Sequence, residues 1–142
     1  MSLSKLIAPL LLTAASGLAI AAPPPKAVLL DHSSSAVMDA DTAKALLAEG
    51  IPAKVWKVYP ASKWAYSSQV EGGITSSGIC VITARVMLLP LTPTMKATLL
   101  RPRKTATAFD AQAGATADQC KELAKVKLKQ AIEGVVSSLA KT

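Results

Sequence analysis

The strongest pattern of hydrophobic and polar positions lies in residues 79–89, ICVITARVMLL. Its even-numbered positions form one wholly apolar face, because successive side chains of a strand point to opposite sides. They are Cys80, Ile82, Ala84, Val86 and Leu88. The odd-numbered positions are also largely apolar, with Thr83 and Arg85 as exceptions. This pattern predicts a central strand that is covered on much of both faces. It leaves open whether this chain or another copy supplies the second cover.

Alternation and turn residues predict further strands around this one. Residues 64–70 alternate, and residues 55–59 are rich in β-formers and end at Pro60. Residues 94–101 and 104–110 are interpreted as two more strands joined by the turn RPRK. Turn chemistry before the central strand occurs at 72–73 and again at 76–78. The sequence does not decide which of these two turns is the hairpin tip.

Two segments have helical spacing. The first is DADTAKALLAEG, which Asp39 or Asp41 can cap and which Gly50 can close. The second covers residues 117–140, where Thr116 and Gln119 form a T-x-x-Q capping box at the start. A long apolar arc along this second segment predicts a helix packed on the sheet.

Together these elements predict an α+β fold with one disulfide. We expect an antiparallel β-meander of four to five strands, flanked by an N-terminal helix and a long C-terminal helix. Cys80 lies on the central strand and Cys120 lies in the first turn of the C-terminal helix. Two cysteines in an exported protein permit one intramolecular bridge, so we expect a Cys80–Cys120 disulfide. The alternative is two reduced, buried thiols.

The start of the chain has the pattern of an export signal. Lys5 precedes an apolar run over residues 6–20, and Ala19-Ile20-Ala21 is a small-x-small cleavage pattern. We expect a cleaved signal peptide over 1–21, cut after Ala21, rather than a retained membrane anchor. Residues 22–35, with three consecutive prolines, then form an extended N-terminal lead-in. Residues 36–142 form a single α+β domain without a transmembrane segment, in a periplasmic or secreted protein.

The composition narrows the classes of partner. The chain carries 16 Lys and Arg against 9 Asp and Glu, a formal net charge of +7. Such a protein is attracted to anionic lipid, acidic polysaccharide or an acidic protein partner. Nucleic acid is disfavoured as a partner because the expected compartment is outside the cytoplasm.

Little in the sequence indicates catalysis. The single histidine, His32, stands beside Asp31 and Ser33, which are the residue types of a nucleophilic triad. Adjacency in sequence does not provide the geometry of a triad, so a solvated loop is the simpler interpretation. One histidine and two paired cysteines leave no set of zinc ligands, and no phosphate-binding or dinucleotide-binding glycine motif occurs. We therefore expect no catalytic, metal or cofactor site, and favour a protein that is not an enzyme.

Two segments are candidates for binding a partner. Residues 55–68 contain four of the five aromatic side chains of the chain, with lysines between them. The sequence leaves open whether this cluster is core or surface. We expect Trp64 and Tyr66 mainly inside, and Trp56 and Tyr59 as the candidates for exposure and partner contact.

The second segment is the RPRK turn, with the cationic side chains Arg101, Arg103 and Lys104. Its simpler interpretation is a solvated charged turn.

These observations favour an exported, non-catalytic interaction protein that binds a cell-envelope component or a protein partner. One alternative is a direct binder of anionic lipid or polysaccharide through the basic surface. A second alternative is a small envelope hydrolase that uses His32. The sequence identifies neither the ligand nor the oligomeric state.

Overall fold

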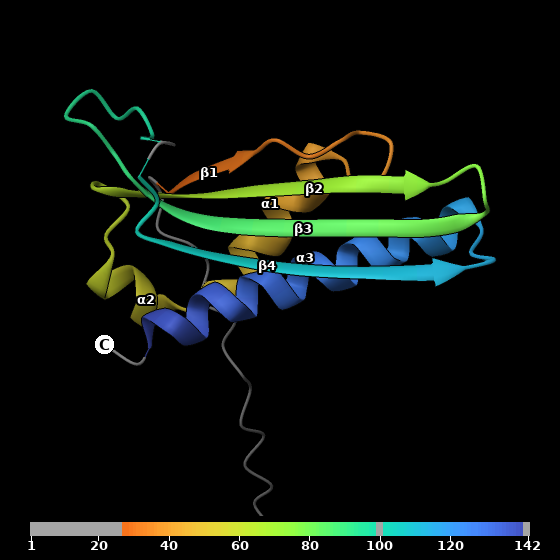
Figure 1. Ribbon diagram of the computed structural model, residues 1–142. Helices are drawn as coiled ribbons and strands as arrows, with labels where there is room; N and C mark the ends of the chain where they lie inside the picture. The colour runs from red at the N-terminus through yellow and green to blue at the C-terminus, as the bar shows by residue number, and fades with distance from the viewer. Residues whose placement is uncertain (1–26, 99–100, 141–142) are drawn as a thin grey trace, which may run out of the picture.

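The computed structural model describes residues 27–98 and 101–140. The elements follow one another as β1 (Val28–Asp31), α1 (Ala40–Gly50), α2 (Ala53–Val58), β2 (Trp64–Ile74), β3 (Ile79–Pro90), β4 (Lys104–Ala113) and α3 (Ala117–Leu139). The four strands form one sheet in the order β1-β2-β3-β4. Figure 1 shows the helices on one side of this sheet, so the molecule has two layers and an α+β fold. The predicted signal peptide, residues 1–21, lies outside the described residues.

The sheet is mixed, so the expected purely antiparallel meander is wrong in one strand. Pairing is antiparallel between β2 and β3 and between β3 and β4. Pairing between β1 and β2 is parallel, with Val28 opposite Ala65. The crossover that parallel pairing requires is supplied by α1 and α2. The segment expected as an extended lead-in, residues 22–35, therefore contributes a strand to the sheet.

Two strands predicted from the sequence are absent from the described residues, and the hairpin turn between β2 and β3 is now identified. Residues 55–59 are not a strand, because residues 53–58 form α2. Residues 94–98 contain no strand, and pairing there is limited to the bridge between Leu91 and Ala97. The end of that expected strand, at residues 99–100, lies outside the described residues. The hairpin tip between β2 and β3 is the later turn, where the amide of Gly78 donates to the carbonyl of Thr75 at 3.0 Å.

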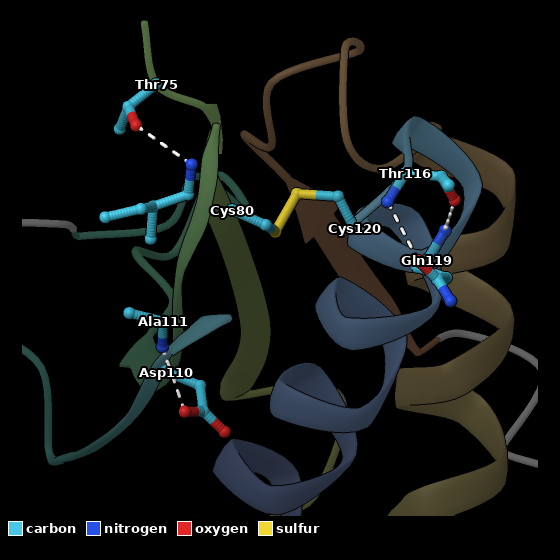
Figure 2. Close-up of a disulfide and its surroundings, with 8 residues drawn as sticks. Thr75, Cys80, Asp110, Ala111, Thr116, Gln119 and Cys120 are labelled. Atoms are coloured by element: carbon cyan, nitrogen blue, oxygen red, sulfur yellow. Dashed lines mark hydrogen bonds between the residues drawn. A yellow bond between two sulfur atoms is a disulfide. The ribbon is translucent and has the colours of Figure 1, made fainter. Parts of the chain in front are cut away.

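Both long helices begin where the capping residues predict. Asp39 is the N-cap of α1, and its carboxylate accepts a hydrogen bond from the amide of Thr42 at 2.8 Å. This bond lowers the pKa of Asp39, because it stabilises the charged carboxylate. Thr116 and Gln119 form the reciprocal capping box of α3, which Figure 2 shows. These bonds occupy backbone donors that the first turn of a helix leaves without partners.

The core lies between the sheet and the helices. The even-numbered side chains of β3 from Cys80 to Leu88 are fully buried, and α3 packs against β3 and β4. The odd-numbered side chains Val81, Thr83 and Arg85 are exposed. The expectation that β3 is covered on much of both faces is therefore wrong for the middle of the strand. The helices of residues 27–98 and 101–140 lie on one face only, and we refer to the other face of the sheet as the open face.

The expected disulfide is present between Cys80 and Cys120. Their Cα atoms lie 5.7 Å apart, and the bridge joins the start of β3 to the first turn of α3 (Figure 2). Disulfides persist in oxidising compartments. The bridge therefore points to an envelope or extracytoplasmic location.

Removing this bridge is expected to destabilise the fold. The two cysteines are 40 residues apart, and closing a loop of that length stabilises a protein by about 4 kcal/mol in the chain-entropy model. In the double variant Cys80→Ala/Cys120→Ala, the free energy of unfolding in urea is expected to fall by about 2–5 kcal/mol. An unchanged urea midpoint, or two reactive thiols in unreduced wild-type protein, would contradict a stabilising bridge.

Candidate partner-binding surfaces

The aromatic cluster is part of the core. Trp56 and Tyr59 are each only 7% exposed, so the expectation that they offer an exposed contact surface is wrong. Tyr66 is fully buried as expected, and Trp64 is half-buried. Two edge-to-face contacts organise the cluster: Trp56 lies 5.2 Å from Tyr66 and Tyr59 lies 5.4 Å from Trp64, centroid to centroid. The helical spacing of α2 turns Val55, Trp56 and Tyr59 inward, and burial raises the pKa of the Tyr66 phenol.

The basic turn is exposed. Arg101 and Arg103 are both accessible, while Lys104 is half-buried at the first position of β4. The backbone amide of Arg103 donates to the carbonyl of Leu88 at 2.8 Å, which fixes the end of the turn against β3. Within residues 27–98 and 101–140, the ion pairs are Lys125–Glu122 and Lys127–Asp110. The cations of the basic turn therefore have no acidic partner in that part of the chain, and their role in binding stays a prediction.

The residues around His32 form a structural network rather than a triad. The Asp31 carboxylate accepts hydrogen bonds from the hydroxyls of Ser33 at 2.6 Å and Ser68 at 2.7 Å. The Ser33 hydroxyl in turn accepts from the amide of Val70 at 2.9 Å. The His32 side chain is exposed, and no hydrogen bond in the described part of the chain joins it to Ser33. The arrangement lacks the nucleophile–base contact of a triad and instead ties the end of β1 to β2.

A residue that the sequence interpretation missed stands on the open face. Phe109 is 78% exposed at the middle of β4 and lies directly opposite Thr83 of β3. Val81, at 40% exposed, and Arg85 lie on the same face. The alternation of residues 104–110 separates Phe109 from Ala106 and Ala108, but it does not say which of the two sets faces the core. The small side chains of Ala106 and Ala108 pack on the core, which places Phe109 on the opposite side of the strand.

The outer edge of the sheet is formed by β4. In the described chain β4 pairs with β3 alone, so its second edge carries unpaired backbone groups. Near its end, the Asp110 carboxylate accepts from the Lys127 ammonium of α3 at 2.7 Å. It also accepts from the amide of Ala111 at 2.9 Å (Figure 2). Both contacts favour the charged carboxylate and lower the pKa of Asp110, with Lys127 as the larger cause.

Clefts lie between the helices, and two of them have volumes of about 320 and 370 Å³. One of about 320 Å³ separates the starts of α1 and α3 and has a lining of mixed charge: Ser35, Val37, Met38, Asp39, Thr42, Asp118, Lys121, Glu122 and Lys125. Its Lys125 is paired with Glu122 at 2.7 Å, and this contact raises the pKa of the lysine. The other, of about 370 Å³, is more apolar and lies between α2 and the end of α3. It is lined by Lys54, Val55, Val58, Tyr59, Leu139 and Ala140.

Two further properties bear on function. In residues 27–98 and 101–140, no group of three or more His, Cys, Asp or Glu side chains is placed to hold a metal ion. Over the same residues, no helix is both long enough and apolar enough to cross a membrane.

Comparison with known proteins gives resemblances to solved structures only. No protein-family model matches the chain, and no curated protein matches it. Among solved structures, it resembles a putative lipoprotein from Caulobacter crescentus CB15, with 11% sequence identity and a TM-score of 0.42. The match covers 80% of this chain and 88% of the other. A likeness of this degree carries no argument about function.

The different roles of Asp31 and His32 can be tested by substitution. In Asp31→Ala the Ser33 hydroxyl loses its acceptor, and the buried Ser68 hydroxyl keeps only the carbonyl of Leu30 at 3.4 Å. The free energy of unfolding is therefore expected to fall by about 1–3 kcal/mol. In His32→Ala an exposed side chain is removed, and the change is expected to stay within about 0.5 kcal/mol. Urea titrations of both variants measure this difference. Equal losses of stability would contradict the network.

Proposed function

We propose that the protein is an exported, non-catalytic interaction protein that binds a protein partner of the cell envelope through the open face of its sheet. The observation that carries this proposal is Phe109, a large aromatic side chain that is 78% exposed at the middle of the edge strand β4. It stands on a face that none of the described helices covers.

The surroundings of Phe109 suit a protein interface. Aromatic residues and arginine are enriched at the centres of interfaces, where a few side chains supply most of the binding energy. Phe109 has Val81 and Thr83 beside it on β3, and Arg85 lies two positions further along. Gln69 and Glu71 of β2 border a shallow depression together with Thr83 and Arg85. An apolar anchor with a polar surround is the arrangement that an interface needs.

The compartment and the lack of catalytic geometry support the same proposal. The Cys80–Cys120 disulfide is expected to persist only outside a reducing cytoplasm, and the predicted signal peptide over 1–21 supplies the route. The hydroxyls of Ser33 and Ser68 donate to Asp31 and not to His32, an arrangement that does not favour the hydrolase alternative.

The open face can be tested with a matched pair of exposed residues. Exported, oxidised protein is used to capture partners from envelope extract at high salt, as wild type, Phe109→Ser and Val58→Ser. Val58 is 66% exposed but lies on α2, in the helical layer. We expect Phe109→Ser to lose the captured protein at least tenfold and Val58→Ser to retain it. Equal capture by all three proteins would contradict the proposal.

A second candidate function is supported by the basic turn. Arg101 and Arg103 are exposed and have no acidic partner in the described chain, as a site for anionic lipid or polysaccharide requires.

Vesicles that contain anionic lipid test this second function. Binding is expected to weaken in Arg101→Glu/Arg103→Glu, and to weaken in wild type as salt rises, because exposed charges are screened. The control Lys44→Glu/Lys54→Glu changes the net charge equally on exposed positions of α1 and α2. If both double variants lose binding equally, the effect is net charge and not a site at the turn.

A further inference from the structure

We propose that two copies of the chain form a symmetric dimer in which their β4 strands pair antiparallel about a two-fold axis at Thr107. The two four-stranded sheets then form one continuous sheet. This proposal goes beyond the partner binding described above and does not depend on it.

The first observation is the direction of the backbone groups of β4. The amide of Gly114 donates to the carbonyl of Gly78 at 3.0 Å, and the antiparallel register continues from there without a break to Leu88 and Lys104. In such a ladder, hydrogen-bonded pairs recur at every second residue. The even-numbered residues of β4 therefore bond to β3. The odd-numbered residues Thr105, Thr107 and Phe109 direct their amides and carbonyls to the free edge.

The second observation is that the middle of this edge, residues 105–109, lacks the usual protection. Natural edge strands are commonly short or bulged, or carry proline, lysine or inward-pointing charged residues. The two charged residues of β4, Lys104 and Asp110, lie outside residues 105–109. Residues 104–113 form a ten-residue strand without proline, paired to β3 in continuous register. Thr105, Thr107 and Phe109 are also residue types that favour strands. The edge is suited to accepting another strand.

The third observation is charge complementarity, which selects both the occupant and the register. With the axis at Thr107, Lys104 lies opposite the partner's Asp110, and Asp110 lies opposite the partner's Lys104. Opposite charges at directly facing positions stabilise an antiparallel pair. An axis at Ala106 places Lys104 opposite the partner's Ala108, and an axis at Ala108 places it opposite the partner's Gln112. Only the axis at Thr107 makes the two charges of β4 meet, and it does so twice.

The local contacts of Asp110 agree with this register. Its carboxylate is already oriented at the edge by Lys127 and by the amide of Ala111. Because that amide is occupied, the uninterrupted run of outward residues is Thr105, Thr107 and Phe109, which is centred on Thr107. In the paired strands, Thr105 lies opposite the partner's Phe109 on the open face. Phe109 thus gains a neighbour on its exposed side while its ring stays on the open face.

The helical layer permits this pairing. A two-fold axis perpendicular to the sheet keeps both helical layers on the same side. α3 packs across β3 and β4, and neighbouring strands lie about 4.8 Å apart. The axes of the two α3 helices then lie roughly 10 Å or more apart, which is at or beyond the usual separation of packed helices. The two helices can therefore lie side by side without collision.

The test uses charge reversal in the exported, oxidised chain, with mass measured by analytical ultracentrifugation. We expect wild type to reach twice the chain mass as its concentration rises. Lys104→Glu places two acidic pairs across the interface and Asp110→Lys places two basic pairs. Each variant alone is therefore expected to dimerise at least tenfold more weakly. An equimolar mixture of the two variants restores opposite charges at all four positions and is expected to recover the dimer.

A matched control separates this interface from net charge. Lys44→Glu changes the charge as Lys104→Glu does, but on an exposed position of α1, and is expected to dimerise as wild type. Near-ultraviolet circular dichroism confirms that each variant is folded. The proposal is overturned if wild type stays monomeric up to its solubility limit. It is also overturned if the mixture stays monomeric, or if Lys44→Glu weakens the dimer as much as Lys104→Glu.

A cross-link tests the register independently. Residues at a hydrogen-bonded antiparallel pair have Cα atoms about 5.5 Å apart, which is within the range of a disulfide. Thr107→Cys is expected to form a covalent dimer under mild oxidation. Thr105→Cys, which faces the partner's Phe109, is expected to form at least tenfold less. Equal cross-linking at both positions would overturn the axis at Thr107. Loss of envelope binding in Phe109→Ser has no bearing on this result, because the purified chain is measured alone.

Discussion

The packing of α3 on β3 and β4 is the contact on which the rest of the structure depends. This packing buries the even-numbered face of β3. The Cys80–Cys120 bridge ties the start of β3 to the first turn of α3. The capping box at Thr116 and Gln119 starts the helix at the right residue for that bridge. Because α1, α2 and α3 all lie on one side, the described part of the chain has no element that covers the other face of the sheet.

The sequence predicted the elements whose signals are local. Thr116 and Gln119 mark the start of α3 by the side-chain oxygens that a first turn requires. For α1 the sequence offered Asp39 or Asp41, and Asp39 is the cap. The two cysteines permit one pairing. Prediction failed where tertiary contacts decide. The strand propensity of residues 55–59 yields to α2, because a helix turns Val55, Trp56 and Tyr59 together onto the core. The parallel position of β1 depends on pairing with residues nearly forty positions away, which no local pattern records.

Of the two segments predicted to bind a partner, the aromatic cluster is buried and the basic turn is exposed, for physical reasons. Aromatic rings dominate the burial energy of a small core, and the contacts of Trp56 with Tyr66 and of Tyr59 with Trp64 place this cluster inside. Charged guanidinium groups stay in water, so Arg101 and Arg103 are exposed as their chemistry requires. The informative aromatic residue is the isolated one. Phe109 alternates with core alanines, and the sequence alone does not say which face of that strand the helices cover.

Charge acts at two length scales in this molecule. The net charge of +7 repels other copies at long range, and a basic protein is thereby kept from random association. At the β4 edge the arrangement of individual charges matters instead. Lys104 and Asp110 carry opposite charges and lie on either side of Thr105, Thr107 and Phe109, whose backbone groups point to the free edge. A strand with this arrangement is complementary to itself in the antiparallel direction, and in one register. Repulsion at long range and complementarity at short range together favour a specific pair over open-ended aggregation, because closing the two edges on each other leaves no long free edge of β4.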